Sequence, residues 1–348
     1  MLHPFFSVIL CLYNQAFFLE RGIKFLFSQV FQDFEILLID DGSTDSTSSL
    51  CDKISESHPN INVVHQENQG LGSARNMGIE IANGKYLCFF DVDDIIGPNW
   101  LQNIYDEIKE INPDLLIYGY KEININFHSE NSFRFERHLL KDKSHLAKEF
   151  VENLSGIKFN NGFAWNKVYR RNFILDNGLR FSSEIIQQDE IFNHRVYECC
   201  PSILISDKIL YNYYIYEKGN NRNRYIHQRI RNFENVKGSF IEIKNNLGIK
   251  DERLDKYIHL RFIRNVLYNR NPLNSFKDRK SFYANIINNN QVIDSMTYLK
   301  KNNLKIKNIH DLFFSIFCLG IRKKSPATLL IIDYLYSGML FLFFLIRK

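Results

Sequence analysis

The sequence lacks the patterns that identify several common classes of protein. Its six cysteines contain no CxxC pair and no spacing typical of zinc sites. Cys11 and Cys88 lie within apolar runs, where a thiol behaves as a small hydrophobic group, and this pattern is typical of a reducing compartment. No basic segment followed by a long apolar run opens the chain, so we expect no signal peptide and a cytoplasmic location.

The sequence also has little net charge and lacks one common nucleotide motif. The formal net charge is only +5, so we expect no nucleic-acid partner. No GxGxxG follows the first apolar run, which disfavours a dinucleotide-binding enzyme. The 348 residues are 45% hydrophobic and 24% charged, as in a globular protein of two domains or of one domain with a large appendage.

Up to about residue 120, apolar runs of strand length alternate with helical patterns. The apolar runs occupy residues 5–12, 34–39, 60–65, 85–90 and 114–119. Helical patterns lie between them, at about 17–29, up to 54, at 73–82 and at 99–111. This order predicts an α/β fold with a mostly parallel sheet and helices on both of its faces.

The fourth apolar run ends in a cluster of acids. Asp91, Asp93 and Asp94 follow it directly, and clustered carboxylates are costly unless a cation neutralises them. Carboxylate oxygens suit a hard divalent ion such as Mg²⁺ or Mn²⁺, which would in turn hold phosphate oxygens of a substrate.

Two further positions near strand ends favour an anionic ligand. Asp41 follows Asp40 at the carboxyl end of a buried strand, where open α/β sheets bind ligands. Arg75 falls in the first turn of a predicted helix, where its charge opposes the helix dipole. A bound phosphate would explain Arg75, and a solvated surface arginine is the alternative. Asp45 has the simpler interpretation of a helix cap.

The middle of the chain is less informative. Residues 121–148 are polar and weakly patterned, and we interpret them as a connecting or acceptor-side segment. A helix pattern after Gln188 presents Asp189 at its start, where a helix cap is the alternative to a functional acid. Short strands are expected at 203–205 and 209–215. The basic cluster that follows is either a solvated face or closes over a diphosphate; it comprises Arg222, Arg224, His227, Arg229 and Arg231.

The C-terminal part is helix-like, and its last segment is apolar. Residues 327–346 are long enough to span a bilayer, but Asp333 and the basic flanks make an interfacial helix at least as plausible. A buried packing helix is the third interpretation. Basic residues beside apolar ones suit the anionic inner surface of a membrane.

Taken together, the motifs resemble the family 2 inverting glycosyltransferases of the GT-A fold. The resemblance rests on residues 7–14, 40–45, 68–78 and 84–94, and it extends through Trp165-Asn166-Lys167 and Gln188-Asp189-Glu190 to about residue 195. It implies a nucleotide-sugar-binding half at 1–120 and an acceptor-side half with the catalytic base at 121–230, and it lapses past about residue 230. From the sequence pattern we expect residues 231–348 to form a helical extension, with an apolar end that is a candidate for association with a membrane.

The resemblance also implies roles for individual residues. Asp189 corresponds to the catalytic base, although Gln188 replaces the glutamate that usually precedes it. Asp93, with Asp91, corresponds to the ligands of Mn²⁺ or Mg²⁺. The implied nucleotide-sugar contacts are Tyr13, Asp41, Arg75, Asp91, Asp93, Trp165 and Lys167.

The function that these roles imply is transfer of a hexosyl or N-acetylhexosaminyl group from a nucleotide-diphosphate donor, with UDP favoured. The acceptor is expected to be a hydroxyl of a saccharide, lipid-linked because of the apolar C-terminus, in surface-polysaccharide biosynthesis. One alternative is a noncatalytic member of the same fold that binds nucleotide-sugars or saccharides. The other is an aspartyl-nucleophile phosphatase, because Asp91-Val92-Asp93 resembles that motif, but Ile95 stands where it expects Thr or Val.

Overall fold

The computed structural model describes residues 3–182, 186–199, 202–216, 226–268, 276–302, 325–326 and 328–329. The chain divides into two compact units. The first contains Met1–Gly219 and Ser239–Lys250, and the second contains Asn220–Gly238 and Asp251–Lys348. The predicted halves 1–120 and 121–230 thus lie mainly within one unit.

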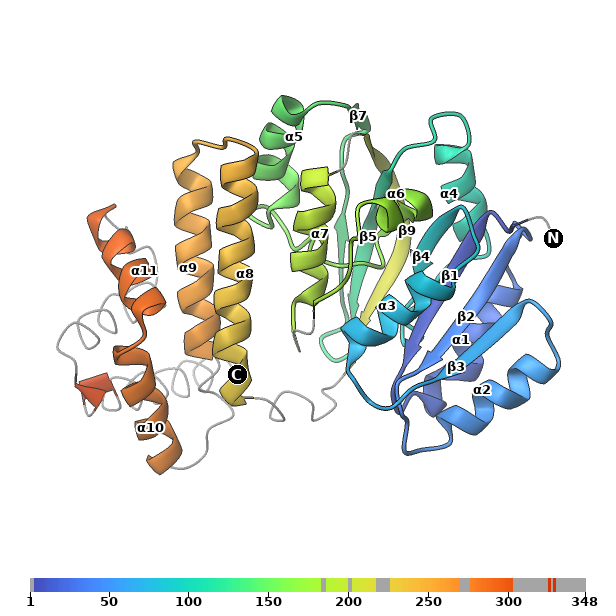
Figure 1. The fold of residues 1–348 in the computed structure, drawn as a ribbon, viewed down its shortest axis with the longest axis horizontal. Coiled ribbons are helices and arrows are strands. Elements are labelled where there is room, and N and C mark those ends of the chain that lie inside the picture. Colours follow the sequence, from blue (N-terminus) through green and yellow to red (C-terminus); the bar gives the residue numbers. More distant parts are fainter. Residues whose placement is uncertain are drawn as a thin grey trace. The chain divides into compact units, whose positions relative to one another are not determined.

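The first unit is built on a mixed sheet with strand order β3-β2-β1-β4-β8-β5-β9-β7 (Figure 1). Strands β1 to β4 run parallel, and β8 is antiparallel to both β4 and β5, while β5 and β9 are again parallel. The expected α/β fold with a mostly parallel sheet is confirmed. The strands are β1 (Phe6–Leu12), β2 (Phe34–Asp40), β3 (Ile61–His65), β4 (Tyr86–Phe89), β5 (Leu115–Asn124), β6 (Ser129–Phe133), β7 (His138–Leu140), β8 (Lys167–Arg170) and β9 (Ile203–Ile215).

Helices cover both faces of this sheet because its central strands are apolar on both sides. Even-numbered residues of β1, such as Val8, pack in one core with α1 (Ala16–Phe27), α2 (Thr47–Glu56) and α4 (Trp100–Ile108). The opposite face carries α3 (Leu71–Ile81), whose Gly78 lies so close to Ile9 that a Cβ there would meet its Cγ2 at 2.4 Å. Figure 1 shows these helices around β1 and β2.

The region 121–148 is more regular than its composition predicts. Strand β5 continues to Asn124, and β6, β7 and α5 (Lys143–Glu149) follow, with a π-helix at Phe150–Leu154. β6 is mostly exposed, so it has no apolar run to reveal it. The two short strands expected at 203–205 and 209–215 are one strand, β9, which pairs with β5 through register shifts around Gly119.

The remaining helices are α6 (Arg171–Asp176) and α7 (Gln188–Cys199), then α8 (Ile226–Asn246), α9 (Glu252–Tyr268), α10 (Phe276–Ile287) and α11 (Asn290–Lys301). The prediction of a helical C-terminal region is therefore confirmed. Within the described part of the chain, no helix has the length and apolarity needed to cross a membrane. Most of the apolar segment 327–346 lies outside the described residues, as do Arg222 and Arg224 of the basic cluster.

Candidate active site

Three parallel strands bring their carboxyl ends to one edge of the sheet. Leu12 pairs with Asp40 in register, and the Asp41 N–H donates to the Leu12 carbonyl over 2.8 Å. Tyr13, the next residue, is half-buried beside this strand end. Strand β4 pairs with β1 on its other side and leads into Asp91. The predicted residues Tyr13, Asp41 and Asp91 therefore follow adjacent strands at the same edge.

The Asp41 carboxylate organises the loop that follows β3. It accepts hydrogen bonds from the backbone N–H groups of Gln69 (2.9 Å) and Gly70 (2.8 Å), and from the Gln66 side chain (2.7 Å). Asp41 is buried, and Gly70 takes a φ of 90°, a conformation that favours glycine. The loop 66–70 is thereby fixed around a single carboxylate.

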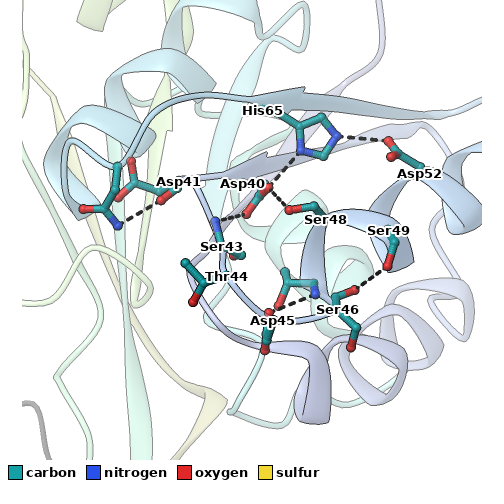
Figure 2. Close-up of polar contacts among 12 residues, drawn as sticks. Asp40, Asp41, Ser43, Thr44, Asp45, Ser46, Ser48, Ser49, Asp52 and His65 are labelled. Carbon is teal, nitrogen blue, oxygen red and sulfur yellow. Dashed lines mark hydrogen bonds and ion pairs between the residues drawn. The ribbon is translucent and has the colours of Figure 1, made fainter.

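Its neighbour Asp40 is held by a separate network that includes His65 (Figure 2). Asp40 accepts from the Ser43 N–H, the Ser48 hydroxyl and His65 Nδ1, the last at 2.8 Å. His65 Nε2 lies 3.0 Å from Asp52 on α2. Burial acts to raise the pKa of Asp40, but these donors lower it, and the hydrogen bonds to Asp40 and Asp52 raise the pKa of His65.

Sequence reasoning missed this histidine. The available signal was its position at the carboxyl end of β3, in register with Asp40. Asp45 lies one residue before Ser46, the N-cap of α2, so it is not the cap residue itself, although its carboxylate accepts from the N–H of Thr47, the first residue of α2.

Arg75 is buried, so the alternative of a solvated surface arginine is wrong. Its guanidinium forms an ion pair with Asp189 and lies 4.0 Å from Asp91. It also packs over the rings of Phe89 and Phe181, at 5.8 Å and 5.2 Å from their centroids. Burial acts to lower the pKa of Arg75, but the charges of Asp189 and Asp91 outweigh it and raise the pKa. The opposed helix dipole is thus compensated by two carboxylates of the protein.

The three acids after β4 have different surroundings. The Asp91 side chain is 38% exposed, and Asp94 is buried and accepts from the Tyr214 N–H over 2.8 Å. The Asp93 carbonyl accepts from Arg21 (2.7 Å) and from the Tyr216 hydroxyl (2.9 Å), which fixes the turn. The expected cluster therefore divides, because Asp94 is directed toward β9.

The charge balance at this turn fits a cation. Desolvation raises the pKa of Asp91, with Arg75 opposing the change and Asp93 adding to it. Desolvation also raises the pKa of Asp93. Across the described ranges, no three His, Cys, Asp or Glu side chains converge as a metal site. Asp91 and Asp93 offer the oxygen ligands that Mg²⁺ or Mn²⁺ prefers, and further ligands would have to come from a substrate or water.

Asp189 lies in the first turn of α7 and forms an ion pair with Arg75. One of its carboxylate oxygens pairs with Arg75, and the other accepts from the Ala164 N–H over 3.2 Å. The side chain is 18% exposed. The structure thus brings together Asp91 from the turn after β4, Arg75 from α3 and Asp189 from α7.

Trp165 and Lys167 are placed in the interior. Trp165 is 2% exposed and stacks on Tyr211, with ring centroids 4.5 Å apart. Lys167 is fully buried, and its ammonium donates to the carbonyls of Asn161 and Phe163. Their contact with a nucleotide-sugar stays a prediction.

Comparison with known sequences assigns the chain to a protein family. Residues 7–176 match the family described as "Glycosyl transferase family 2". Glycosyltransferase GlyG of Streptococcus pneumoniae serotype 4 is 30% identical over 215 residues, which cover 60% of this chain and 69% of GlyG. The regions aligned with three bacterial relatives span from 30% to 69% of the length of those proteins.

Solved structures also resemble this chain. S. aureus TarS residues 1–349 in complex with UDP-GlcNAc aligns with a TM-score of 0.66 at 20% identity, covering 96% of this chain and 91% of that one. The mannosyltransferase PcManGT from Pyrobaculum calidifontis, in complex with GDP-Man and Mn²⁺, aligns with a TM-score of 0.51 at 15% identity, covering 95% and 86%. At these identities the likeness shows a shared fold.

Proposed function

Because the chain belongs to glycosyl transferase family 2, we propose that it is an inverting enzyme that moves a sugar from a nucleotide-diphosphate donor to an acceptor hydroxyl. Membership makes the chain a glycosyltransferase with the GT-A fold. The inverting mechanism, the donor and the acceptor are our proposals.

One observation supports the mechanism: a single buried guanidinium lies within ion-pair distance of two carboxylates, one at each of its terminal nitrogens. Arg75 pairs with Asp189 and lies 4.0 Å from Asp91. The acid proposed as base and an acid proposed for the phosphate side therefore border the same small space. A single displacement needs the base and the leaving group close to one sugar and on its opposite faces, and we propose that Asp189 and the Asp91 side serve these two places.

In this mechanism Asp189 takes the proton of the acceptor hydroxyl as that oxygen attacks the anomeric carbon. The bond from the anomeric carbon to the diphosphate oxygen breaks in the same step, and the configuration inverts. The Ala164 N–H and Arg75 hold the two oxygens of Asp189 and so fix its direction. A divalent ion held by Asp93 and Asp91, when bound, would stabilise the charge on the leaving diphosphate.

For the donor we favour a UDP-sugar that carries a hexosyl or N-acetylhexosaminyl group. Tyr13 and Asp41 border the strand edge where the base would lie, with Asp41 as acceptor for an imide N–H. The TarS complexes with UDP and UDP-GlcNAc support this choice as analogies of fold.

For the acceptor we favour a lipid-linked saccharide used in surface polysaccharide, reached at the cytoplasmic face of the membrane. The support is the apolar and basic sequence 312–348. Deleting residues 325–348 should move the protein from vesicle-bound to free in a flotation assay with anionic vesicles. Full-length protein that never floats with the vesicles would remove this part of the proposal.

The function is tested by a thermal-shift screen of nucleotide-sugars with Mn²⁺, followed by turnover of each stabilising donor. We expect a UDP-sugar to raise the melting temperature only when Mn²⁺ is present. Absence of both stabilisation and turnover across UDP-, GDP- and dTDP-sugars would overturn the proposal in favour of a noncatalytic role.

A further inference from the structure

Buried polar side chains form hydrogen bonds with the loop 161–164, which contacts the proposed base. Residues 161–164 contain the Ala164 N–H that donates to Asp189 over 3.2 Å. The Lys167 ammonium donates to the carbonyls of Asn161 (2.8 Å) and Phe163 (2.7 Å), and to the Asn166 side chain (2.8 Å). The ammonium also donates to the Asn161 side-chain oxygen over 3.4 Å, so four acceptors surround its three N–H groups.

Helix α7 also forms hydrogen bonds with this loop. Asn193, one turn after Asp189, donates from its side chain to the carbonyls of Gly162 (2.9 Å) and Phe163 (3.1 Å). Its own oxygen accepts from the buried Tyr169 hydroxyl over 2.7 Å. The loop also packs tightly on α7, because a Cβ at Gly162 would lie 3.2 Å from the Glu190 Cβ.

These contacts close a ring between loop and helix. Asn193 of α7 fixes the loop, and the loop returns one N–H to Asp189 of α7. We infer that Lys167 and Asn193 are positioning residues that keep the Ala164 N–H aimed at Asp189, and so set the direction in which the base faces the acceptor. The inference rests on the proposed function, because it takes Asp189 as the base.

The cost of burying Lys167 supports this role. Burial lowers the pKa of Lys167 to about 7, and the carboxylates of Asp189 and Glu190 oppose that shift only in part. A buried ammonium is expensive unless its hydrogen bonds are complete. An apolar residue would fill the core at lower cost, so the lysine is best explained by the loop geometry that it enforces.

The test uses full-length Lys167→Met, Asn193→Ala and Tyr169→Phe, in order of decreasing damage to the network. Tyr86→Phe is the matched control, because it removes one buried hydrogen bond, to the Pro113 carbonyl, that does not involve the loop. The first readout is amide hydrogen exchange, which needs no substrate. Exchange at residues 161–164 should accelerate in Lys167→Met and Asn193→Ala and stay unchanged in Tyr86→Phe.

The second readout is UDP release from UDP-GlcNAc, UDP-glucose and UDP-galactose with Mn²⁺. We expect kcat per folded enzyme to fall about 10- to 100-fold in Lys167→Met, because a small misplacement of a reacting group costs about that much. The KM for the donor should change little. If Lys167→Met does not fold, Asn193→Ala decides the question by the same two readouts.

The outcomes separate this inference from the proposed function. Unchanged exchange at 161–164 together with wild-type kcat in the folded variants overturns the positioning role, even if Asp189→Asn is inactive. The proposed function with a UDP-type donor fails if Asp189→Asn keeps its turnover, or if the wild type releases UDP from none of the three donors. In either case hydrogen exchange still decides whether the loop depends on Lys167. A kcat loss matched by Tyr86→Phe would also count against a specific role.

Discussion

The two sides of the candidate site differ in how their carboxylates are satisfied. At the end of β2, Asp40 and Asp41 receive hydrogen bonds from backbone N–H groups, hydroxyls, an amide and His65. After β4, Asp91 and Asp93 have raised pKa values, and Arg75 is the nearest compensating charge for Asp91. On the first side the protein itself supplies most of the hydrogen-bond donors, whereas the second side has more negative charge than the protein neutralises.

This difference suggests a division of labour. A carboxylate whose bonds are already made holds a loop in shape, and a carboxylate whose charge is uncompensated gains most from an incoming cation. We therefore expect changes on the Asp91 and Asp189 side to affect catalysis and metal binding, and changes on the Asp40 and Asp41 side to affect stability and donor affinity.

The largest effect is expected from Asp189→Asn. The amide cannot accept the proton of the acceptor hydroxyl, so turnover should fall by about 10²- to 10⁴-fold. Donor binding with Mn²⁺, measured by calorimetry with UDP, should stay close to wild type. Asp176→Asn, in the short helix α6, serves as a control for loss of an acid. Full turnover in Asp189→Asn would remove this residue from the role of base.

The second-largest effect is expected from Asp93→Ala. The Mn²⁺-dependent part of UDP affinity should fall by about 10-fold or more, because charge stabilisation by a metal is worth several kcal/mol. The melting temperature without metal should be unchanged or higher, since a carboxylate with a raised pKa is lost. Equal calorimetric affinities of wild type and variant, with and without Mn²⁺, would show that Asp93 holds no metal.

Asp41→Asn should act on stability as well as on binding. In Asp41 one carboxylate oxygen accepts from the Gln69 N–H and the other from the Gly70 N–H. The asparagine has an NH₂ group in place of one of these oxygens, so one of the two hydrogen bonds is lost. The free energy of unfolding should therefore fall by about 1–3 kcal/mol. Urea unfolding measures this loss, and UDP affinity should fall with it. A variant as stable as the wild type would show that loop 66–70 does not depend on this carboxylate.

The smallest effect is expected for the contribution of His65 to the pH dependence of stability. Its pKa is raised in the folded protein, so its stabilisation is complete below the ordinary histidine pKa and is lost as pH rises through the folded pKa. Because the side chain is 41% exposed, the effect should be at most about 1 kcal/mol. The stability difference between wild type and His65→Gln should therefore shrink between pH 6 and pH 9, by about that amount. A constant difference would contradict this linkage.

The sequence predicted the strands whose side chains are buried on both faces. β1 and β2 are continuous apolar runs, and a parallel sheet covered on both sides requires such runs. β6 is largely exposed, and β8 is a four-residue strand that includes Lys167, so neither has an apolar run. Their positions depend on tertiary pairing with β5, which no local pattern encodes.

The site was predictable as a set of residues but not as a set of contacts. Asp91 and Asp189 stand out as acids at element ends, whereas Arg75 and Asp189 are 114 positions apart and nothing local pairs them. Lys167 illustrates this limit for a buried group. Its place in a motif suggests a ligand contact, but no local pattern predicts that its ammonium donates to the carbonyls of Asn161 and Phe163.

The sheet of the first unit ends at β7, which pairs with β9 through only His138, Leu139 and Leu140. An edge strand this short presents few unpaired amides to a strand from another copy of the protein. Concentrated preparations should therefore resist edge-to-edge assembly at this end of the sheet. Lengthening β7 by design would be a direct way to make the protein prone to aggregation.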